Sequence, residues 1–301
     1  MGFFKRHQGR ASYELFSNYA HYLPGLGGMM TLFLLFIIGS IIGSLLNSLF
    51  VLLMGASDAV NSYGMLISYP VSFIPPLLYA SAKSRRNEMF DTGYALDSNN
   101  FGSKGGLVIA LTVSLATVAA AFVIEPVGKL LPEMPAFLEE ALKSMTNGPL
   151  WASLLSVSVF APLFEEWLCR GLVLRGLLNK MNPAGAICIS AAFFATLHFN
   201  PWQAIPAFVL GLLFGYVYYR TGSLKLTMLM HCVNNTLATI VSRIPAFEDA
   251  ETFMDILAPW KYGVIFALSL VVLTSSIIII KAIPVKDTRM GNCDKVDPLT
   301  I

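Results

Sequence analysis

Charged residues are scarce in this 301-residue sequence. Asp, Glu, Lys and Arg make up 13% of it and hydrophobic residues make up 55%, whereas about 25% of an average soluble domain is charged. The chain therefore lacks the polar surface of a large soluble globule, and its hydrophobicity excludes intrinsic disorder. The 20 basic residues are nearly balanced by 18 acidic ones, which leaves no basic stripe for nucleic acid. We expect no nucleic-acid partner.

Cysteine is also too scarce for a disulfide framework. The sequence has four cysteines and none is paired at the CxxC spacing of redox or zinc motifs. Cys169, Cys188 and Cys232 lie in apolar runs, where cysteine usually packs as a small hydrophobic residue. We find no internal repeat and no soluble domain. These features indicate an integral membrane protein with several spans, for which the lipid bilayer is the first partner.

A transmembrane helix needs about 20 mostly apolar residues. We expect an all-α, polytopic membrane fold of about eight transmembrane helices, over residues 29–53, 65–82, 107–124, 150–180, 184–199, 202–219, 224–241 and 262–283. The second of these contains three prolines, so we expect it to be kinked.

The distribution of basic residues predicts the orientation of these helices. Lys and Arg precede the first helix and follow the second, fourth, sixth and eighth, whereas the intervening loops are acidic or neutral. Since cytoplasmic loops are enriched in Lys and Arg, both termini should be cytoplasmic. We expect a cytoplasmic segment at 1–28, a transmembrane domain at 29–283 and a cytoplasmic tail at 284–301. The expected location is the inner (plasma) membrane of a bacterium.

Ionisable residues within membrane spans are costly, at about 2.5–3.5 kcal/mol each, and mark functional sites by default. In the fourth span, Glu166 and Arg170 are four residues apart and are therefore neighbours on one helical face. Glu165 points about 100° away from Glu166. We expect Glu166 and Arg170 to form an ion pair that leaves Glu165 unpaired. Glu165 is then either a hydrogen-bonding residue in helix packing or a general base in a desolvated site, and we favour the base.

Two further polar clusters lie in the fifth and seventh spans. His198 is near the end of the fifth, and His231 and Asn235 are aligned at i,i+4 in the seventh. Glu165 with His198 could hold and deprotonate a water, while His231 and Asn235 donate hydrogen bonds to the resulting oxyanion. Alternatively, Glu165, His198 and His231 could bind Zn²⁺ with an open fourth position. The spacing does not distinguish these two arrangements.

The three clusters resemble the motifs of the CPBP family, the CAAX proteases and bacteriocin-processing enzymes also called Abi. That family carries EExxxR, FxxxH and HxxxN or HxxxD on successive membrane helices. The corresponding residues of this sequence all lie within a motif core at 150–241: Glu165 and Glu166 with Arg170, Phe194 with His198, and His231 with Asn235. The resemblance implies an eight-helix intramembrane endopeptidase, similar to the Ras-converting CAAX endopeptidase.

The resemblance also implies a role for each motif residue. It implies Glu165 as the water-activating carboxylate and His198 as its partner, His231 and Asn235 as the oxyanion-stabilising pair, and Glu166 and Arg170 as a structural ion pair. The substrate would be a membrane-associated peptide or protein, with or without a lipid. Both metal-dependent and metal-free mechanisms are consistent with the motifs. We favour no cofactor, with zinc as the alternative.

Two other functions could use the same residues. In a proton-coupled transporter the Glu, His and Arg side chains would form a relay, but no cluster has the second copy that an inverted repeat would supply. A non-catalytic immunity or scaffold protein would be favoured by a degraded site, and every motif position is intact. Cys169 lies four residues after Glu165 and is a further candidate nucleophile. The sequence shows no surroundings that would lower the pKa of its thiol in a site lined by carboxylates.

Convergence of these residues places one demand on the fold. Counted at about 1.5 Å per residue, Glu165, His198 and His231 start at different depths from the cytoplasmic ends of their helices. They can meet if the fourth helix is long and tilted and reaches Lys180, or if the fifth helix starts outside the hydrocarbon. We expect the former.

Overall fold

The structure, a computed structural model, describes residues 17–90, 93–247, 252–285 and 295–296. These residues are almost entirely helical; the exception is a two-residue antiparallel pair, β1 (Gly93–Tyr94) with β2 (Lys295–Val296). The predicted all-α membrane fold is confirmed. Most of the two predicted cytoplasmic segments, at 1–16, 286–294 and 297–301, lies outside the described residues.

The first half of the chain forms three long spans, which are α1, α2 with α3, and α4, and a connecting helix, α5. Its elements are η2 (Ser17–Tyr19), α1 (Leu26–Met54), α2 (Asp58–Ser72), α3 (Ile74–Asn87), η3 (Gly102–Lys104), α4 (Gly106–Gly128) and α5 (Ala136–Asn147). Helices α2 and α3 are broken at the buried Phe73, because Pro75 and Pro76 have no N–H to continue the hydrogen-bond ladder. The predicted kink is confirmed. Helix α5 lies in a stretch that the sequence indicated only as an external loop.

The second half contains the three motifs. Its elements are α6 (Leu150–Ser153), η4 (Leu154–Phe160), α7 (Ala161–Glu166), η5 (Trp167–Leu174), α8 (Arg175–Leu178), α9 (Pro183–Thr196), α10 (Pro201–Thr221), α11 (Leu224–Val241), η6 (Pro245–Phe247), α12 (Phe253–Ile256) and α13 (Pro259–Lys281). From α6 to α8 the chain runs as one helix of 29 residues, which confirms the predicted long fourth helix. Within it, η4 and η5 are π-helical.

Six helices among the described residues are long and apolar enough to cross a membrane: α1, α2 with α3, α4, α6 to α8, α10 and α13. Helix α9 has 14 residues, about 21 Å at the usual rise. Helix α11 has 18 residues but carries His231 and two asparagines. Every predicted span corresponds to helix, and the count of eight membrane crossings stays a prediction.

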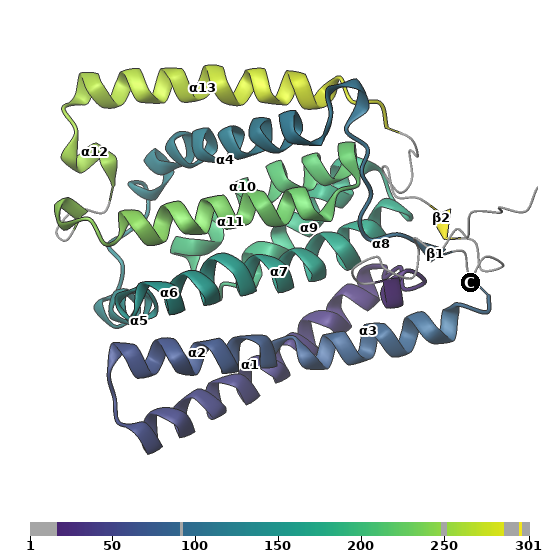
Figure 1. Ribbon diagram of the computed structural model, residues 1–301, viewed down its shortest axis with the longest axis horizontal. Helices are drawn as coiled ribbons and strands as arrows, with labels where there is room; N and C mark the ends of the chain where they lie inside the picture. Colours follow the sequence, from purple (N-terminus) through teal and green to yellow (C-terminus); the bar gives the residue numbers. More distant parts are fainter. Residues whose placement is uncertain (1–16, 91–92, 248–251, 286–294, 297–301) are drawn as a thin grey trace, which may run out of the picture.

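The helices form a bundle with the long fourth helix in its interior (Figure 1). Helices α4 and α13 pack together on one flank and α1 packs against α2 and α3 on the other. Between them lie α6 to α11. Every residue of η5 and α8 is buried, so this part of the fourth helix is shielded from lipid.

The two ends of the bundle differ in charge. We call the end at which α1, α4, α9 and α11 begin the basic end, and the end at which they finish the acidic end. The chain crosses the basic end at 88–105, 179–182, 222–223 and 282–285, and the acidic end at 55–57, 129–149, 197–200, 242–247 and 252–258.

Arg175 closes the basic end. The charge pattern counted this residue among the exposed basic residues at the end of the fourth span, but the structure shows it fully buried in α8. Its guanidinium donates to the carbonyls of Tyr19 (2.8 Å), Tyr22 (2.9 Å), Ala20 (3.2 Å) and Tyr94. A fork of five donors matches this set of carbonyls. The residue therefore fixes the N-terminal segment and the loop around β1 across the end of the fourth helix.

We predict that Arg175→Met lowers the free energy of unfolding by about 3 kcal/mol or more, since several buried carbonyls lose their donor at once. Thermal unfolding in detergent micelles measures this. Arg86→Met at the same end is the matched control, because Arg86 is exposed and its loss should cost no more than about 0.5 kcal/mol. Equal effects of the two substitutions would contradict the assignment.

Candidate active site

A cavity of about 750 Å³ lies between α1, α2, α5, the fourth helix, α10 and α11. All four residues predicted to be catalytic line it: Glu165 from α7, His198 just after α9, and His231 and Asn235 from α11. Much of the remaining wall is apolar. The structure thus brings three motifs that are separated in sequence to one space.

Glu165 presents one free carboxylate oxygen in this cavity. Its Oε1 accepts a hydrogen bond from the Tyr69 hydroxyl. Its Oε2 is buried without a hydrogen-bond partner among the described residues, and lies 3.9 Å from His231 Nε2. A buried, unpaired carboxylate oxygen is costly and requires an explanation. One explanation is that this oxygen binds a water molecule, since the cavity wall also carries the polar side chains of His231 and Asn235.

Glu166 and Arg170 form the ion pair that the spacing predicts. Arg170 Nη1 lies 2.8 Å from Glu166 Oε1, and both side chains are completely buried. Arg170 Nη2 also donates to the Gly211 carbonyl at 3.1 Å, and the guanidinium lies 4.5 Å from the centre of the Phe194 ring. A side chain at Gly211 would crowd Ala191 of α9 at 3.1 Å. Glycine there allows α10 to approach closely enough for this contact.

His231 connects the ion pair to Glu165. Its Nδ1 lies 3.1 Å from Glu166 Oε1. Since an ionised carboxylate only accepts hydrogen bonds, Nδ1 carries the proton. Nε2 is then the nitrogen that faces Glu165. Glu166 therefore orients the imidazole, a contact that the sequence pattern did not reveal.

Asn235 binds the backbone carbonyl of Val157, which lacks its usual backbone donor because of Pro162. Its Nδ2 donates to the Val157 carbonyl at 2.8 Å. In η4 the ladder runs from residue i to i−5, as from Ala161 N to Ser156 O. The next donor in that register would be residue 162, which is proline and has no N–H. The π-helical turn thus frees an acceptor for Asn235 and leaves the second amide N–H of that side chain available.

His198 lies just beyond α9 in a tight turn. Its Nδ1 is 3.2 Å from the Phe194 carbonyl, and Asn200, which caps α10, donates to the His198 carbonyl at 2.9 Å. The next residue, Phe199, has a φ of 55°, a left-handed conformation that is uncommon for an aromatic residue. Its ring stacks on Phe36 of α1 at 6.2 Å. Within the described part of the chain, His198 and Glu165 share the cavity without direct contact.

Tyr69 is the site residue that the sequence analysis missed. It comes from α2, which carries no family motif, and its hydroxyl is one of several polar groups on that helix, so nothing in the sequence singled it out. Cys169 is fully buried and does not line the cavity. A cysteine nucleophile at that position would have no access to substrate.

The zinc alternative does not fit the geometry of the side chains. Among the described residues, no three His, Cys, Asp or Glu side chains are grouped so that they could hold one metal ion. His198 and His231 each use Nδ1 for another contact, which leaves Nε2 as the nitrogen that a metal could take. No step of the mechanism proposed below is routed through a metal.

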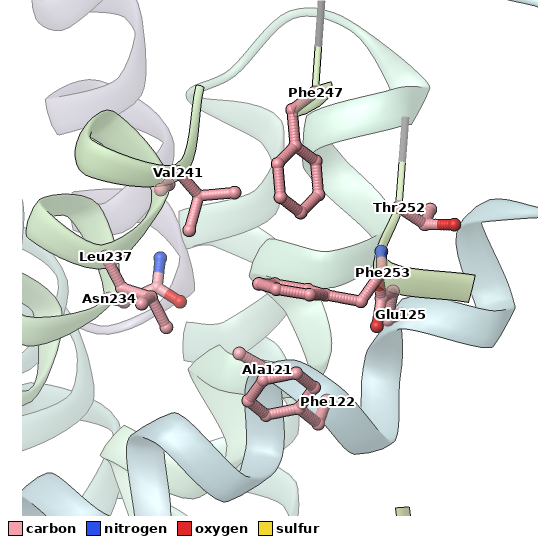
Figure 2. Close-up of a pocket in the computed structure, with 10 residues that line it drawn as sticks. Ala121, Phe122, Glu125, Asn234, Leu237, Val241, Phe247, Thr252 and Phe253 are labelled. Carbon is pink, nitrogen blue, oxygen red and sulfur yellow. The ribbon is translucent and has the colours of Figure 1, made fainter. Parts of the chain in front are cut away.

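A second, smaller cavity of about 170 Å³ lies between α4, α11 and the segment around α12. Figure 2 shows the rings of Phe247 and Phe253 in its wall, with Glu125 beside Phe253; the Glu125 carboxylate accepts from the Phe253 backbone N–H. Asn234 lines both cavities and donates to Asn235 Oδ1 at 3.1 Å. The smaller cavity contains none of the predicted catalytic residues.

Comparison with protein families agrees with the geometry. A family model described as type II CAAX prenyl endopeptidase, Rce1-like, matches residues 147–237. The motif-bearing core of this chain is similar to the CAAX-protease family. The match spans just under a third of the chain and includes all three motifs. The similarity supports an intramembrane protease of the CAAX type at the level of the family. Neither the curated proteins nor the solved structures gave a match.

We predict that Arg170→Met destabilises the protein by about 3–5 kcal/mol, because it leaves the Glu166 carboxylate buried and unpaired. The double variant Glu166→Gln/Arg170→Met should lose less than the sum of the two single variants. Unfolding of all three in detergent completes the double-mutant cycle. Strictly additive losses would contradict an ion pair.

Proposed function

We propose that the protein is an endopeptidase that hydrolyses a peptide bond of a membrane-associated protein or peptide by a water that Glu165 activates. The observation that carries the proposal is the single free oxygen of Glu165. Tyr69 occupies the other oxygen, and the Glu166–Arg170 pair neutralises the neighbouring carboxylate. What is left is one unpaired basic atom at the wall of a cavity large enough for a peptide.

The proposed reaction uses residues of this chain alone. Glu165 Oε2 takes a proton from water as the water oxygen bonds to the scissile carbonyl carbon. The second N–H of Asn235, and His231 when Nε2 is protonated, donate to the oxyanion that forms. Collapse breaks the C–N bond while Glu165 returns the proton to the leaving nitrogen. His198, on the same cavity wall, is proposed to position the water or the substrate.

The competing functions have less support. A proton relay requires groups in series across the membrane, whereas Glu165, His198 and His231 line a single cavity. A scaffold has no use for an unpaired buried carboxylate oxygen. We propose the plasma membrane of a bacterium as the location.

We predict that Glu165→Gln lowers kcat by at least about 100-fold, the usual contribution of a general base. The amide keeps the volume and can still bind Tyr69, so the unfolding temperature should change little. A fluorogenic panel of CAAX-like peptides with the purified protein measures the rate. Retention of activity in Glu165→Gln would overturn the assignment.

The same assay separates the metal-free mechanism from the zinc alternative. Wild-type activity should survive dialysis against a chelator, and zinc should not raise it. Loss of activity on chelation, with recovery on adding zinc, would place Glu165, His198 and His231 in a metal-dependent mechanism instead.

We predict that Asn235→Ala lowers kcat by about 100-fold with little change in KM, since its amide acts on the oxyanion and not on bound substrate. Asn234→Ala is the matched control: it removes an amide that also lines the cavity but contacts only Asn235. We expect a smaller loss there. An effect of Asn235→Ala confined to KM would contradict the oxyanion role.

A further inference from the structure

The catalytic cavity reaches the acidic end of the bundle. Its wall includes Leu138, Leu142 and Lys143 of α5, Gln203 in the first turn of α10, and Ser242 just after α11. All of these belong to segments that cross or border the acidic end. The mouth of the cavity therefore lies at this end.

The cavity does not reach the basic end. Its lining residues nearest that end are His231 and Phe214, each about 10 Å from the basic-end terminus of α11 or α10 at the usual helical rise. Beyond them, η5 and α8 are buried at every position. Arg175 fixes the N-terminal segment over them, and Ser98 and Gly222 join at 2.8 Å. Within the described residues, the cavity wall thus has no member in the segments that cross the basic end.

The charges of the described residues assign the two ends to the two sides of the membrane. At the acidic end lie four basic residues, Lys129, Lys143, Arg243 and Lys261. Nine lie at the basic end: Lys83, Arg85, Arg86, Lys104, Arg175, Lys180, Arg220, Lys225 and Lys281. Because Lys and Arg concentrate on the cytoplasmic side, the basic end faces the cytoplasm.

From these observations we propose that the catalytic cavity opens on the extracytoplasmic side of the membrane. The substrate is then an exported peptide, or the extracytoplasmic part of a membrane protein, and its cleavage follows translocation. A cytoplasmic C-terminus, as in a prenylated CAAX protein, would meet the closed basic end. This inference rests on the proposed peptidase function and adds the side from which the substrate arrives.

The cavity wall also favours one type of segment. Phe36, Met65 and Leu142 contribute apolar surface, and Lys143 at the mouth is paired with Glu139 at 2.7 Å. A peptide with apolar residues beside the scissile bond suits this wall, as found where an exported segment leaves the bilayer.

The first test measures sidedness without a substrate. In a variant whose four native cysteines are replaced, single cysteines are introduced as Leu142→Cys and Ser242→Cys at the mouth, and as Lys104→Cys and Lys225→Cys at the basic end. Intact cells are treated with a membrane-impermeant maleimide. We expect labelling of the first two only, and labelling of all four after permeabilisation. Labelling of the basic-end cysteines in intact cells would overturn the inference.

The second test measures cleavage on each side. The CAAX-like peptide sequence cut fastest in the panel is fused to a single-span anchor, placed once outside and once inside the cell. We expect cleavage of the outer reporter alone in cells, absent in Glu165→Gln, and of both reporters by the detergent-solubilised protein. Cleavage of the inner reporter alone in cells would leave the peptidase function intact and refute the substrate side. Failure to cut either reporter in detergent would refute the peptidase function itself.

Discussion

The buried pair of Glu166 and Arg170 is the contact on which the rest of the site depends. Arg170 binds the backbone of α10 at Gly211 and lies over the Phe194 ring of α9, while Glu166 binds His231 of α11. One ion pair thus connects the fourth helix to three others. Burying two charges is expensive; here Glu166 Oε1 contacts both Arg170 and His231, whereas Glu166 Oε2 and Arg170 Nε have no hydrogen-bond partner among the described residues. Because Glu166 is ion-paired with Arg170, it is not available as a base. Glu165 has no such counter-charge and is the carboxylate that we propose as the base.

The irregular backbone of the fourth helix supplies what the side chains need. In a regular α-helix most carbonyls already accept a backbone N–H of the same helix. The π-helical turns release the carbonyls of Val157 and Cys169, which accept from Asn235 and from Ser190 of α9 at 2.8 Å and 2.9 Å. Such turns are frequent at functional sites. In this protein they serve to attach α9 and α11 to the helix that carries the carboxylates.

Features that depend on a single helix could be predicted from the sequence. Contacts between residues far apart in the sequence could not. The composition gave the membrane class, and i,i+4 spacing gave the Glu166–Arg170 pair, since both follow from one helix alone. The partner of Glu165 could not be found this way: Tyr69 is 96 residues distant and belongs to no motif. Arg175 was expected to be exposed because it is charged. In the structure it is buried, and four backbone carbonyls that accept from its guanidinium compensate for the burial. Helix α5 has mixed polarity, which in a membrane protein resembles a loop.

The uneven burial of the helices has a consequence for how the protein responds to its lipids. In the most apolar stretch of the fourth helix 61% of residues are buried, against 22% in α1 and 17% in α13. Hydrophobic mismatch acts on surfaces that touch acyl chains. A thinner or thicker bilayer is therefore accommodated by tilting of the outer helices, while the helix that bears the carboxylates is insulated from it. Changes in lipid composition should leave the spacing of the catalytic groups intact.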